Sequence, residues 1–106
     1  MKIGVVVYSG DAETVWNAFR FANFARASGD EVTVFMLGKG VEFESLGAPK
    51  FNVPEQWQTF IANSGRIYAC GTCLEIHQIK PSQTYTVGTL SNLHDIVKTS
   101  DRVVTF

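Results

Sequence analysis

The sequence predicts an α/β fold, a three-layer α/β/α sandwich built on a mainly parallel five-stranded sheet. Short apolar segments alternate with amphipathic segments along the whole chain, which is typical of strands alternating with helices. The first apolar segment is nearly continuous, as expected for a parallel strand covered on both faces. With 106 residues and 45% hydrophobic residues, the chain suits a single domain, residues 1–106, around one core.

The first elements follow from hydrophobic spacing and turn residues. Apolar residues recur at helical spacing from Val15 to Ala25, and Gly29 lies where a helix would end. We therefore expect a strand over residues 2–8, a helix over residues 11–27 and a strand over residues 31–37.

The longest irregular stretch is expected over residues 38–54, which hold several glycines and prolines. Loops of this length are uncommon in compact domains and are often functional. Phe43, Leu46 and Phe51 lie within it. We expect this apolar surface either to be covered by another subunit or to belong to a mobile lid.

The second half of the chain continues the alternation. Pro54 suits the first turn of a helix, and Ser91 can cap another. We expect helices over residues 54–63, 70–78 and 91–99, and strands over residues 66–69, 84–87 and 102–106. Since ligands gather at the carboxyl ends of parallel strands, the segments 8–11, 38–43 and 70–73 should meet there and build one site.

The motif Cys70-Gly71-Thr72-Cys73 contains the only two cysteines and directly follows the third predicted strand. A helix N-terminus favours a thiolate over a thiol, so Cys70 is the candidate nucleophile, with its sulfur expected to be accessible at the sheet edge. Cys73 lies one turn later, as a resolving thiol or as a packing residue behind Cys70. The N–H groups of Thr72 and Cys73 are expected to stabilise a bound sulfur, and Gly71 to admit a close approach by another protein's cysteine.

Other uses of this motif are less consistent with the sequence. Thioredoxin-like proteins carry such a motif after an early strand and have a partnering proline, which is not evident here. Leu74 stands where c-type haem attachment needs histidine, and a zinc site using His77 would lack a fourth ligand. Asp11 and Glu13 would repel the phosphate that a flavodoxin-like protein holds after its first strand. We therefore expect neither a metal nor an organic cofactor.

The charge balance also limits the function. A formal net charge of −1 gives no reason to expect nucleic acid or an anionic membrane as partner. The chain begins with a strand-like run rather than a signal peptide, and it has no apolar segment long enough to span a bilayer. A cytoplasmic location is expected, where thiols stay reduced and a cysteine pair indicates sulfur, redox or metal chemistry.

Four places resemble the DsrE/DsrF-like family, which includes TusD-type sulfur-relay proteins. They are the strand Ile3–Tyr8, the segment from Ala18 to Val32, the strand end at Cys70, and the terminal run Ser100–Phe106. The resemblance implies a DsrEFH-like α/β/α domain that forms homo-oligomers, typically trimers or hexamers. In sulfur-relay members the strand-end cysteine accepts sulfane sulfur from a donor protein and hands it to an acceptor protein. That role carries over to Cys70 by position, but not to Cys73.

These observations favour a small cytoplasmic sulfur carrier, a sulfurtransferase-type protein that holds a persulfide on Cys70. Whether it turns over as an enzyme is left open by the sequence. Attack of Cys73 on the persulfide would instead release hydrosulfide. Two alternatives stay open: a non-catalytic oligomeric module that binds a small molecule, and a thiol–disulfide oxidoreductase that uses Cys70 and Cys73.

Overall fold

Five parallel strands form one sheet in the computed structural model, which describes residues 1–106. The strands are β1 (Lys2–Val7), β2 (Glu31–Met36), β3 (Arg66–Cys70), β4 (Thr86–Gly88) and β5 (Arg102–Thr105). Their order across the sheet is β4-β3-β2-β1-β5, and each neighbouring pair is parallel. The predicted fold class and sheet are thereby confirmed.

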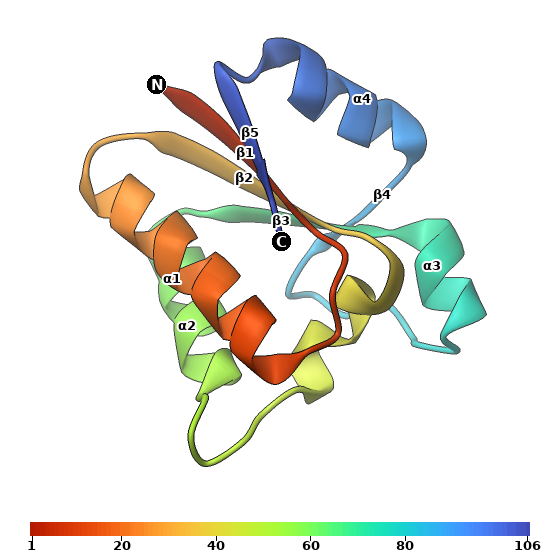
Figure 1. Ribbon diagram of the computed structural model, residues 1–106. Coiled ribbons are helices and arrows are strands. Elements are labelled where there is room, and N and C mark those ends of the chain that lie inside the picture. Colours follow the sequence, from red (N-terminus) through yellow and green to blue (C-terminus); the bar gives the residue numbers. More distant parts are fainter.

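Helices cover both faces of this sheet. They are α1 (Ala12–Ala27), α2 (Val53–Ala62), α3 (Gly71–Ile76) and α4 (Leu90–Thr99), together with a 3-10 helix, η1 (Gly38–Ser45). Figure 1 shows α1 and α2 side by side on one face and α4 on the other, with α3 beyond the end of β3. None of these helices combines the length and the apolar character that crossing a bilayer requires.

Side-chain caps fix where the helices begin. Asp11 accepts a hydrogen bond of 3.0 Å from the Thr14 N–H, so α1 begins one residue later than predicted. Ser91 is not the cap of α4. Thr89 and Asn92 form a reciprocal capping box, which starts the helix at Leu90.

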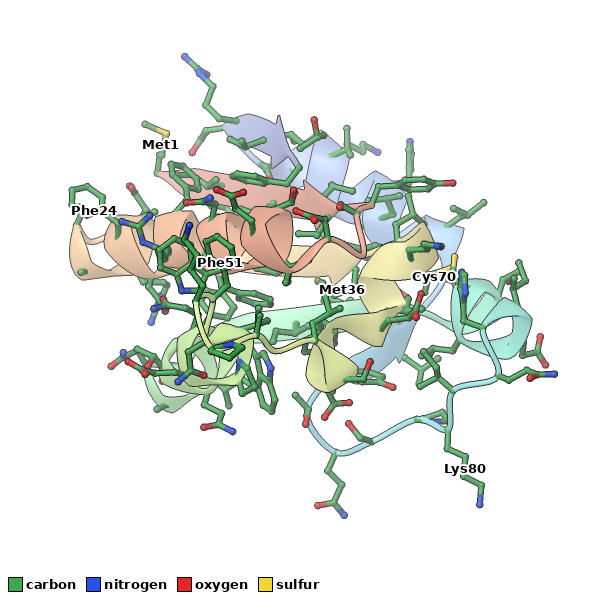
Figure 2. All side chains as sticks on the ribbon, turned by 60° about the horizontal axis from the view of Figure 1, so that its bottom comes forward. Met1, Phe24, Met36, Phe51, Cys70 and Lys80 are labelled. Carbon is green, nitrogen blue, oxygen red and sulfur yellow. The ribbon has the colours of Figure 1, made fainter.

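The stretch predicted to be irregular is largely ordered on the protein's own core. Residues Gly38–Ser45 form η1, and Phe43 is completely buried. Phe51, labelled in Figure 2, lies beside α1. Its ring packs on Trp16 with 5.3 Å between ring centroids, and Leu46 packs against the core. The expectation of a mobile lid or a subunit-covered surface was wrong here, because the aromatic side chains find partners within the same chain.

Candidate functional site

Cys70 ends β3 and caps α3. Its sulfur accepts a hydrogen bond of 3.3 Å from the N–H of Cys73, one turn into the helix. Figure 2 places Cys70 where η1 and α3 approach one another. Its position at the sheet edge is as predicted, but its exposure is not. Cys70 is only 6% exposed, and it lines a pocket.

Cys73 is half-buried and does not lie hidden behind Cys70. Burial raises the pKa of the Cys73 thiol, and its side-chain hydrogen bond with Cys70 raises that pKa further. The N–H of Gly38 donates to the Cys73 sulfur at 3.2 Å and opposes this shift without reversing it. The shift favours the thiol form of Cys73.

Gly38 brings the ends of three strands together. Its φ is +57°, in the left-handed region that favours glycine, and a Cβ there would lie 2.7 Å from the Tyr8 ring. Tyr8 follows β1, Gly38 follows β2, and Cys73 follows β3. These three segments meet at one edge as predicted, but they do not build one pocket together, because the pocket beside Cys70 is lined by no residue of 8–11 or 38–43.

The pocket beside Cys70 has a volume of about 460 Å³. It lies between the ends of β2, β3 and β4 and the starts of α3 and α4. Its lining is Leu37, Cys70, Gly71, Thr72, Cys73, Val87, Gly88, Thr89 and Leu90. Apart from the two cysteines, no lining residue carries an ionisable group.

Sequence reasoning missed three apolar members of this lining, Leu37, Val87 and Leu90. Each lies within or just beyond the carboxyl end of a strand, or at the helix start that follows it. That position was available as a signal. However, the predicted strand over residues 84–87 and the predicted helix over residues 91–99 point to no shared site, and Leu90 falls between them.

Gly71 and Thr72, the other two predicted site residues, both line the pocket. A Cβ at Gly71 would lie 3.1 Å from the Val87 side chain, so glycine lets α3 pack closely on β4. Thr72 lines the pocket, but the N–H that reaches the Cys70 sulfur belongs to Cys73. The His77 ring lies 3.7 Å from the Glu42 carboxylate.

The raised pKa of Cys73 predicts how its alkylation depends on pH. Alkylation of Cys73 should rise with pH around a midpoint above 9.0, the ordinary value for this thiol. The midpoint should fall in Cys70→Ser, which removes the Cys70 sulfur as hydrogen-bond acceptor and charge. Iodoacetamide labelling from pH 6 to 10, quantified for each cysteine by peptide mass mapping, measures the Cys73 midpoint in wild type and in Cys70→Ser. A Cys73 midpoint below that of a free cysteine would contradict the assignment of the two thiols.

Comparison with known proteins agrees with this fold. An uncharacterized protein of Methanocaldococcus jannaschii is 31% identical over 114 aligned positions that cover all of both chains. An uncharacterized protein of Methanopyrus kandleri is 30% identical over 89% of this chain and 83% of its own. The crystal structure of the YchN protein from E. coli shares the fold over all of both chains, with a TM-score of 0.84 at 21% identity. A conserved protein of unknown function from Bacteroides thetaiotaomicron shares it over 99% of this chain and 94% of its own, with a TM-score of 0.78 at 16% identity. The model of the DsrE/DsrF-like family matches residues 1–106, and the chain therefore belongs to that family.

Proposed function

We propose that the protein is a small sulfur carrier that holds sulfane sulfur as a persulfide on Cys70. The observation that carries this proposal is the setting of the Cys70 sulfur. The sulfur accepts a hydrogen bond from a backbone N–H at the start of α3, and Cys70 lines a pocket. Its neighbour Cys73 has a raised pKa, which favours the thiol form. Such a setting stabilises negative charge on sulfur, both in the attacking thiolate and in the persulfide that it forms.

Sulfur transfer then takes two displacements at sulfur. The Cys70 thiolate attacks the terminal sulfur of a donor R–S–SH, which forms Cys70–S–SH and releases the donor thiolate R–S⁻. An acceptor thiolate R′–S⁻ attacks the same terminal sulfur, which forms R′–S–SH and returns the Cys70 thiolate. In each step one sulfane sulfur moves from one thiolate to another. Neither step is a net oxidation or reduction, so no external oxidant or reductant is required.

Cys73 offers a competing second step. As a thiolate, it would attack the inner sulfur of Cys70–S–SH, form the Cys70–Cys73 disulfide and release HS⁻. The contact between the Cys73 N–H and the Cys70 sulfur favours this alternative by keeping the two residues close. The raised pKa of Cys73 opposes it, because less of the attacking thiolate is present at neutral pH. We therefore favour the carrier over the sulfide-releasing reductase and the thiol–disulfide oxidoreductase.

The carrier role implies partners that supply and remove sulfur, with a protein thiol as the final acceptor. We also propose that the chain forms a homo-oligomer. Phe24, on the outer side of α1, is 73% exposed, and Phe21 on the same helix is also exposed. Exposed aromatic side chains of this kind are typical of surfaces that another subunit covers.

Intact-protein mass spectrometry tests the carrier role. Reduced wild type, Cys70→Ser and Cys73→Ser are incubated with inorganic polysulfide until the spectra stop changing, so that a slow donor is not mistaken for an inert protein. We expect one or more added sulfur atoms in wild type and in Cys73→Ser, and none in Cys70→Ser. The two serine variants change one sulfur to oxygen each, so they control for one another.

Two other outcomes would overturn the carrier role. Loss of two hydrogens in wild type, with added sulfur trapped only in Cys73→Ser, would assign sulfide release instead. No added mass in any of the three proteins would favour the small-molecule binding module.

A further inference from the structure

The pocket beside Cys70 is apolar as well as uncharged. Leu37, Val87 and Leu90 supply its aliphatic surface, and the remaining lining is glycine, threonine and the cysteine pair. Its volume of about 460 Å³ is within the range of small-molecule sites. The group that carries the reacting sulfur must occupy this space when the sulfur reaches Cys70.

An anionic carrier group would be disfavoured there for two reasons. Moving a charge out of water into an apolar pocket is costly unless an opposite charge receives it, and no lysine, arginine or histidine lines this pocket. The Cys70 thiolate adds a like charge at close range. The start of α4 adjoins the pocket, and its Thr89–Asn92 capping box occupies two of the N–H groups there, so an anion would meet only a partly satisfied helix end and no full positive charge.

We propose that the pocket selects low-molecular-weight sulfur donors that carry the sulfur on an uncharged, apolar group. It would disfavour donors with carboxylate or sulfonate groups, glutathione hydropersulfide among them. This inference rests on the proposed role of Cys70 as sulfur acceptor, and it names the class of donor that Cys70 meets.

Methanethiosulfonates test the selection with one reactive group and a variable carrier. The Cys70 thiolate attacks the divalent sulfur, forms Cys70–S–S–R and releases methanesulfinate. Ethyl and benzyl reagents are neutral, whereas the 2-sulfonatoethyl reagent is anionic. Rates are measured by stopped flow with Cys73→Ser, in which only Cys70 reacts, and are divided by the rates for N-acetylcysteine amide under the same conditions.

We expect the normalised rate of the anionic reagent to be at least about tenfold below that of the ethyl reagent, because its sulfonate repels the Cys70 thiolate and meets no cation in the pocket lining. The benzyl reagent should equal or exceed the ethyl reagent, since its ring adds apolar contact. Equal normalised rates for the anionic and neutral reagents would overturn the inference.

Two lysine substitutions on α4 locate the effect. Leu90 lines the pocket and is 70% exposed, whereas Val97 is 50% exposed and lies two turns further along the helix, about 10 Å away. Leu90→Lys should raise the rate of the anionic reagent several-fold relative to the ethyl reagent. Val97→Lys should leave that ratio nearly unchanged. Equal effects of the two lysines would mean that the selection does not arise in the pocket, and would overturn the inference.

Persulfide donors then separate this inference from the carrier role. Benzyl hydropersulfide and glutathione hydropersulfide share the reacting end and differ in the carrier group. We expect faster addition of sulfur to Cys70 from the benzyl donor. If both donors load Cys70 at the same rate, the carrier role stands and the selection falls. If the methanethiosulfonates discriminate and neither hydropersulfide nor polysulfide loads Cys70, the carrier role falls.

Discussion

Truncating Phe43 to alanine is expected to lower the free energy of unfolding by about 3–5 kcal/mol. The Phe43 ring is 0% exposed. Its centroid lies 6.0 Å from Phe19, 5.7 Å from Trp57 and 5.8 Å from Tyr85. Removing the ring leaves a cavity among three aromatic groups that belong to different elements. Since domains of this size are stable by only about 5–15 kcal/mol, the loss would be a large fraction of the total.

Urea denaturation followed by circular dichroism measures this loss. Ile76→Ala is the control, because it truncates a large apolar side chain at a site that is mostly exposed and belongs to no proposed interface, and it should change stability by less than about 0.5 kcal/mol. Equal, small effects of the two substitutions would mean that η1 is only loosely attached. That result would restore the mobile lid that the composition of residues 38–54 suggested.

Gly40→Ala is expected to destabilise the protein by about 1–3 kcal/mol through overpacking. A Cβ on Gly40 would collide with the Val7 carbonyl oxygen at the end of β1 and lie 3.1 Å from the Val7 carbonyl carbon. That oxygen cannot move away freely, because it accepts a hydrogen bond of 2.8 Å from the Leu37 N–H. The collision therefore falls on backbone atoms that hold β1 and β2 together.

Gly47→Ala provides the control for Gly40→Ala. A Cβ at Gly47 would meet nothing nearer than Pro54, at 3.9 Å, so this substitution should be neutral within about 0.5 kcal/mol. Urea denaturation again measures stability, and alkylation of Cys73 reports whether η1 has shifted near Gly38. A Gly40→Ala protein as stable as Gly47→Ala, with unchanged alkylation, would contradict the close approach of η1 to β1.

The sheet and α1 could be predicted because their signals are local. The apolar run of β1, the stripe from Val15 to Ala25 and the cap Asp11 each lie within one short segment. η1 could not be predicted in the same way. Its glycines indicate a loop, and its order comes from Phe43, which packs against residues far along the chain.

The site was predictable to the extent that topology determines it. A cysteine at the end of a parallel strand must lie at the carboxyl edge, and Cys70 does. The pocket beside it also depends on Val87 and Leu90, which reach the site from β4 and α4 later in the chain. The hydrogen bond from the Gly38 N–H to the Cys73 sulfur likewise depends on the register between β2 and β3. The spacing of residues along either strand does not specify that register.

The sulfur atom of Cys70 is also the cap of α3, which has only six residues. A group that binds this sulfur changes how well it accepts the Cys73 N–H, so binding at Cys70 and order at the start of α3 are thermodynamically linked. Linkage is reciprocal. A binding partner that orders α3 would thereby change how readily Cys70 takes up sulfur, and sulfur bound to Cys70 would alter how firmly the first turn of α3 is held.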